Sequence, residues 1–141
     1  MKWLDLSFNC IQKIEGLNTL TELQDLSLFS NEIKKVENID NCTKLNVLSL
    51  GNNKIADLES FYLYLRDFKK LEVLNIAGNP FTKKDSEYKL YLMFYLPTLK
   101  YLDYSFIDKA MREMINEDEK LRNEAAAEAS KAKDNAIKEE E

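Results

Sequence analysis

Four asparagines are the most regularly spaced polar residues of this 141-residue chain: Asn9, Asn31, Asn53 and Asn79. Each stands eight residues after the first apolar residue of its segment, at the point where an apolar run ends. An amide side chain both donates and accepts hydrogen bonds, so it can satisfy backbone groups of adjacent turns that are costly to bury unpaired. We therefore predict that these asparagines form a buried structural ladder.

Residues that could carry catalysis are few. The chain has no histidine, which is the commonest general base. Cys10 follows the first asparagine and Cys42 lies at an apolar position of the next segment, so their unlike positions favour neither a redox pair nor a zinc site. The three glycines, Gly16, Gly51 and Gly78, form no phosphate-binding motif. We predict a protein that is not an enzyme and needs no metal and no cofactor.

The composition narrows the classes of partner. Residues 105–141 hold eleven of the 25 acidic side chains and seven of the 20 basic ones, and no basic cluster typical of a nucleic-acid binder occurs. No run approaches the roughly 18 apolar residues of a membrane span, and the first residues lack the apolar core of a secretory signal. With two cysteines, a reducing compartment is favoured. We expect a protein of a reducing compartment with no nucleic-acid or membrane partner.

The asparagines belong to a repeat that must position them. Units begin at Met1, Leu23, Leu45 and Leu71, and a partial unit without asparagine begins at Leu99. The pattern is L-x-x-L-x-L-x-x-N-x-I, the leucine-rich-repeat signature. An amphipathic helix is disfavoured, because it would not place asparagine at one phase of its apolar face in successive units. The predicted fold is an α/β solenoid with parallel strands on the concave face, short helices and turns on the convex face, and a C-terminal helical tail.

Two domains are expected. Residues 1–105 form the solenoid, and a C-terminal cap begins at about residue 82. The longer spacing of the last units predicts helices over 58–68 and 85–96, the second starting with a capping box at Thr82–Asp85 and ending before Pro97. The tyrosines of the second helix are expected to pack rather than to bind.

Residues 106–141 form the predicted tail. They are rich in alanine and charge, with i,i+4 pairs Asp108–Arg112, Asp118–Arg122 and Asp134–Lys138. Spaced apolar residues between 107 and 125 are compatible with the start of a coiled coil, while a solitary or frayed helix remains the alternative.

Strand residues that alternate with the core leucines point outward and define the concave face. Its first row is predicted to be Trp3, Asp25, Val47, Val73 and Tyr101; its second Asp5, Ser27, Ser49, Asn75 and Asp103; its third Ser7, Phe29, Gly51, Ala77 and Ser105. So many apolar residues on an outward face favour protein binding. The alternative is that Trp3 and Tyr101 pack against caps at the two ends. Because no cap precedes the first strand, we also expect either a fragment or shortened form, or a protein that covers this edge.

Several phrases go beyond the generic repeat. Leu-Ser-Leu-Phe at 26–29, Leu-Ser-Leu-Gly-Asn-Asn at 48–53 and Tyr-Leu-Pro at 95–97 resemble the family of dynein regulatory complex subunit 3 over about residues 1–108. The resemblance implies a non-catalytic subunit of the axonemal nexin link in cilia and flagella. Its partners would be coiled-coil subunits of that complex and, indirectly, dynein arms and doublet microtubules. Two alternatives share the repeat class: a phosphatase-targeting regulator and a microtubule-binding axonemal dynein light chain.

Overall fold

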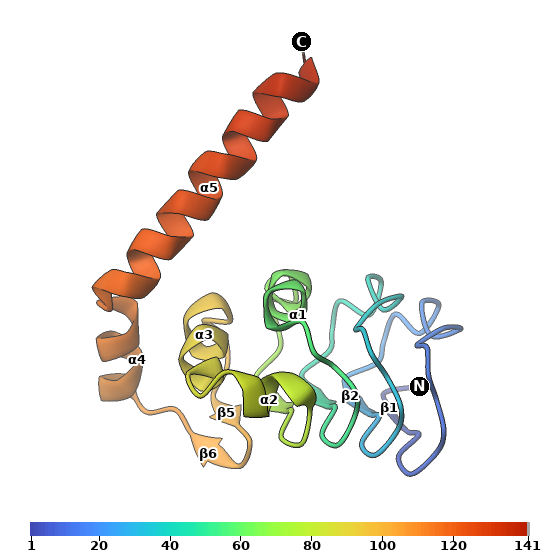
Figure 1. Ribbon diagram of the computed structural model, residues 1–141. Coiled ribbons are helices and arrows are strands. Elements are labelled where there is room, and N and C mark those ends of the chain that lie inside the picture. Colours follow the sequence, from blue (N-terminus) through green and yellow to red (C-terminus); the bar gives the residue numbers. More distant parts are fainter. Residues whose placement is uncertain (141) are drawn as a thin grey trace. The chain divides into compact units, whose positions relative to one another are not determined.

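A computed structural model describes the backbone of residues 1–140 and the side chains of residues 1–131 (Figure 1). The chain divides into two compact units, residues 1–107 and residues 108–141.

The first unit is built on one six-stranded sheet whose strands follow chain order. The strands are β1 (Trp3–Asp5), β2 (Asp25–Ser27), β3 (Val47–Ser49), β4 (Val73–Asn75), β5 (Tyr101–Leu102) and β6 (Ser105–Phe106). The first five run parallel, and β6 turns back antiparallel to β5. Equivalent leucines stand opposite one another, because each repeat enters the sheet in the same phase. The predicted fold class is confirmed.

Three helices accompany the later strands of this unit: α1 (Leu58–Leu65), α2 (Pro80–Lys84) and α3 (Tyr88–Tyr95). Helix α1 begins where the Asp57 carboxylate accepts a hydrogen bond from the Ser60 amide, at 3.1 Å. It ends three residues before the predicted boundary. The capping box predicted at Thr82–Asp85 is wrong, because Thr82 lies inside α2, where its hydroxyl donates to the Asn79 carbonyl at 2.7 Å. Pro80 explains the early start, since its fixed φ suits the first helical position.

The core lies behind the sheet and is formed by the repeat leucines and isoleucines, many of which are completely buried. Helices α1 and α3 pack against each other through aromatic rings. The buried Tyr62 ring stacks on Tyr95, with centroids 4.1 Å apart, and on Tyr91 at 6.4 Å. The tyrosines of the predicted cap therefore take part in packing.

The second unit contains α4 (Lys109–Asn116) and α5 (Glu119–Glu140). Asp108 accepts a hydrogen bond from the Met111 amide at 2.7 Å, and Asp118 accepts one from the Leu121 amide at 3.0 Å. Both aspartates therefore cap helices, and the second cap divides the predicted tail into two. The sheet extends through Phe106, one residue past the predicted end of the solenoid at residue 105. The predicted pair Asp134–Lys138 lies outside the residues whose side chains are described. No helix of the described chain is long and apolar enough to cross a bilayer.

Candidate protein-binding face

The asparagines occupy the turns that follow the strands, and Asn53 shows their geometry. Its side-chain nitrogen donates to the carbonyls of Leu28, Leu50 and Gly51 at 3.0, 2.9 and 3.2 Å. Its side-chain oxygen accepts from the Ile33 amide of the preceding repeat at 3.1 Å. One buried amide thus joins the backbone of two repeats.

Asn31 and Asn79 repeat this arrangement and are also buried. Asn9 differs, because its side chain is exposed and donates only locally, to the carbonyls of Leu6 and Ser7. The expectation of a buried amide is therefore wrong at Asn9. The oxygen of each buried ladder asparagine accepts from a backbone amide of the preceding repeat, and among the described residues Asn9 has no such contact.

The first predicted row of the concave face is continuous in the sheet. Trp3, Asp25, Val47, Val73 and Tyr101 are successive cross-strand partners. Phe106 extends the row, since it pairs with Tyr101 and their rings lie 5.3 Å apart. Trp3 and Phe106 are 74% and 59% exposed, whereas Val47 and Val73 are half-buried. Apart from the exposed Asp25, the row is aliphatic or aromatic, and so many such side chains open to solvent are unusual for a surface without a partner.

The second row is small and polar. Asp5, Ser27, Ser49 and Asn75 are successive partners across four strands. Asp5 is exposed, and hydrogen bonds from the Ser7 hydroxyl and amide lower the pKa of its carboxyl group. Small side chains leave room for another chain to approach the sheet closely.

Asp103 does not belong to this row, although its place in the repeat predicted that it would. Its backbone adopts a positive φ of 47°, and its half-buried carboxylate accepts from the amides of Ile76 and Ala77 at 2.7 and 3.1 Å. The hydroxyl of Tyr88 donates to its other oxygen at 2.9 Å. In earlier repeats the amide equivalent to that of Ile76 donates to a backbone carbonyl of the following strand, as Leu50 does to Asn75. The Asp103 carboxylate replaces that carbonyl just after β4, while β5 and β6 complete the sheet.

Phe29 is less available for binding than its outward position implied. Its ring lies over Gly51 so closely that a Cβ atom added there would be 2.9 Å from it, and Phe8 contacts the ring edge-on at 5.6 Å. Gly51 is buried as a result. A partner would meet the exposed Phe8 beside a half-buried Phe29.

The turn between β5 and β6 adds an aromatic residue that sequence reasoning missed. Tyr104 is 83% exposed and has a φ of 69°, a conformation that favours glycine or asparagine. It belongs to the same hairpin as the exposed Tyr101 and Phe106. The absence of asparagine from the fifth unit was the available signal that this repeat ends differently.

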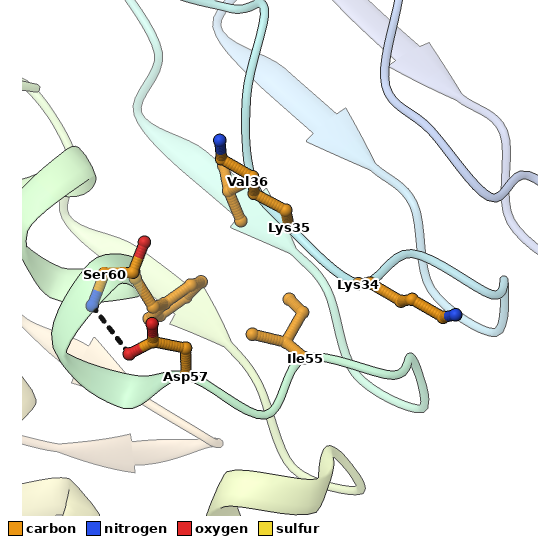
Figure 2. Close-up of a pocket in the computed structure, with 7 residues that line it drawn as sticks. Lys34, Lys35, Val36, Ile55, Asp57 and Ser60 are labelled. Atoms are coloured by element: carbon orange, nitrogen blue, oxygen red, sulfur yellow. Dashed lines mark hydrogen bonds between the residues drawn. The ribbon is translucent and has the colours of Figure 1, made fainter.

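Elsewhere the described residues offer little chemistry. A hollow of about 150 Å³ lies between the segment Lys34–Val36 and the start of α1, as Figure 2 shows. The Asp57 carboxylate on its wall is bonded to the Ser60 amide, and Lys34 extends away from it. Cys42 is buried, which raises the pKa of its thiol, while Cys10 is exposed. Within the described chain, no three His, Cys, Asp or Glu residues are grouped to hold a metal.

Comparison with known proteins identifies the repeat. A family model described as leucine-rich repeat matches residues 1–134. Dynein regulatory complex subunit 3 of Mus musculus is 46% identical over 52 residues, which are 37% of this chain and 10% of the mouse protein. The same subunit of Homo sapiens is 46% identical over 46 residues, 33% of this chain and 9% of the human protein. The chain thus matches about a tenth of the length of these relatives.

The chain is also similar to a second group of proteins, over a longer segment but at lower sequence identity. A Caenorhabditis elegans protein named probable U2 small nuclear ribonucleoprotein A' is 30% identical over 115 residues, 78% of this chain and 44% of that protein. The Drosophila melanogaster SNF/U2A' complex contains a similar chain, with a TM-score of 0.62 and 23% identity over 89% of this chain and 87% of that one. At this identity the structural likeness supports the fold alone.

Proposed function

Because the chain belongs to the leucine-rich-repeat family, we propose that it is a non-catalytic interaction subunit of the axonemal nexin–dynein regulatory complex. Its similarity to dynein regulatory complex subunit 3 supports this assignment. In this role it helps to regulate dynein-driven motility of cilia and flagella. It resides in the cytoplasm, within the axonemal cytoskeleton.

The observation that carries the proposal is the open row from Trp3 to Phe106. A parallel sheet holds these side chains at fixed spacing, so a partner binds them with little loss of conformational entropy. The partners proposed are other subunits of the complex, which are coiled-coil proteins, and through them dynein arms and doublet microtubules.

Axoneme fractionation tests the proposal. The tagged full chain should remain in isolated axonemes after high salt has removed the dynein arms, together with the other subunits of the regulatory complex. Release with the motors would instead identify a dynein light chain. Co-purification with a phosphatase catalytic subunit outside cilia would identify a phosphatase-targeting regulator.

A second candidate rests on the longer alignment with the U2 ribonucleoprotein A' relative, which covers both solenoid and cap. It predicts a nuclear protein in a ribonucleoprotein particle. Nuclear location with ribonuclease-sensitive sedimentation would favour it, and an axonemal location would exclude it.

The binding face has its own test in the pair Val47→Thr and Val73→Thr. Threonine keeps the β-branched shape and strand preference but adds a hydroxyl group. Since both valines point away from the core, the double variant should fold, which circular dichroism checks, yet should be lost from axonemes. Normal assembly of a folded double variant would show that the face is not used.

A further inference from the structure

The two ends of the concave face differ in charge and polarity. Within the described rows its acidic side chains, Asp5 and Asp25, lie on β1 and β2, and both are exposed. The third acid expected there, Asp103, is turned into the sheet closure by its hydrogen bonds to Ile76 and Ala77. No lysine or arginine stands in any of the three rows.

The opposite end is apolar. Val73 is half-buried on β4, and beyond it Tyr101 and Phe106 place two exposed rings in contact. At the border of the face Lys100 is paired with Glu72 at 3.2 Å, so it adds little net charge to this end. At the opposite end of the same border, Lys2 precedes β1 as one basic side chain beside the two carboxylates.

We infer that the concave face receives one segment of a partner protein in a single direction, with basic side chains over Asp5 and Asp25 and aliphatic or aromatic side chains over Val73, Tyr101 and Phe106. This inference rests on the proposed function, whose partner it defines chemically. In the opposite direction, apolar side chains of the partner would remove water from two carboxylates without pairing them, which is costly. Charge at one end and apolar contact at the other therefore fix the orientation.

The strand spacing of the sheet also determines how long the partner segment between two positions must be. Ser27 and Asn75 occupy the second row on β2 and β4, separated by two strand steps. At about 4.8 Å per step the separation is roughly 10 Å. A helical partner covers that distance in about six or seven residues, and an extended one in about three.

Photo-crosslinking in axonemes tests the inference. The full chain would carry p-benzoylphenylalanine in place of Ser27 in one variant and of Asn75 in another, and the attached peptides would be sequenced. We expect one partner segment at both positions, with lysine or arginine within a helical turn of the Ser27 contact and aliphatic or aromatic residues at the Asn75 contact. An acidic or uncharged contact at Ser27, a reversed order, unrelated chains at the two positions, or no crosslink from an assembled chain would each overturn it.

Charge-reversal variants provide a second test of the inference. Asp5→Lys with Asp25→Lys should lower the crosslinking yield from position 75 by at least about fivefold, because the basic end of the partner is then repelled. Glu15→Lys with Glu32→Lys changes the net charge equally but alters exposed acids outside the rows, so the yield should stay the same. Equal yields for the two pairs would refute the charge assignment. A chain absent from axonemes in its unaltered form would instead refute the proposed function.

Discussion

Asn53→Ala tests the asparagine ladder at its centre. Removing the amide leaves the Ile33 N–H without the oxygen that accepts from it at 3.1 Å. The carbonyls of Leu28 and Leu50 keep second partners, because Asn31 and Asn79 also donate to them. The cost therefore concentrates on one buried backbone donor.

An unsatisfied buried donor costs about 1–3 kcal/mol, and for a unit of this size each kcal/mol lowers the melting temperature by roughly 4–8 °C. Asn9→Ala is the matched control, since that side chain is exposed and donates only within its own turn. Asn53→Asp should be worse than alanine, because a carboxylate in this buried position cannot donate to the carbonyls around it.

Thermal unfolding followed by circular dichroism measures all three variants. The expected order of melting temperature is Asn9→Ala near the unaltered chain, then Asn53→Ala, then Asn53→Asp. If Asn53→Ala melted no lower than Asn9→Ala, the buried amide would not stabilise the stack, and the reasoning would fail.

Three further predictions concern the closure, the Phe29 contact and alkaline pH. Asp103→Ala should cost about 1–3 kcal/mol and speed hydrogen exchange of the Ile76 amide, which loses its acceptor. Gly51→Ala should destabilise by about 1–3 kcal/mol because the new methyl group meets the Phe29 ring, and by less in a Phe29→Ala background. Burial, and after it the bond to Asp40, raises the pKa of Tyr64, so the folded state holds this proton more tightly than the unfolded state. The contribution of Tyr64 to stability should be constant below the ordinary tyrosine pKa of 10.0 and fall above it, and Tyr64→Phe should reduce the alkaline fall in urea titrations.

Each of these three predictions would be contradicted by a specific result. Unchanged exchange at Ile76 would mean that the carboxylate is not its acceptor in solution. Equal costs of Gly51→Ala in both backgrounds would place the clash elsewhere, at the Ala77 carbonyl 3.2 Å away. An identical alkaline decline in the Tyr64→Phe variant would assign the lost proton to another group.

The repeat period was enough to predict the strands, their common phase and the outward rows, because a twofold alternation fixes which side chains face the core. It was not enough where one backbone dihedral decides the outcome. Asp103 and Tyr104 both take positive φ in a turn without glycine, and this redirects a carboxylate that the alternation placed on the concave face. The side chain of Phe29 likewise folded onto the space left by Gly51, a contact between repeats that no single repeat reveals.

The helix boundaries could not be predicted accurately where two sequence signals for a helix start compete. Thr82 and Asp85 are compatible with a capping box, yet Pro80 begins a short helix two residues before Thr82 and places Thr82 within it. The sequence of the tail was ambiguous for the same reason. Asp118 is compatible both with an ion pair to Arg122 and with a helix cap, and the structure shows the cap.

The closure by Asp103 has a consequence for how such a protein changes in evolution. A carboxylate that imitates the next strand needs only the backbone amides of the strand before it, and every repeat presents equivalent amides. The arrangement at Asp103 is therefore independent of how many repeats precede it. Duplication or deletion of one 22-residue unit would change the length and partner range of the array, while the same ending would still seal it.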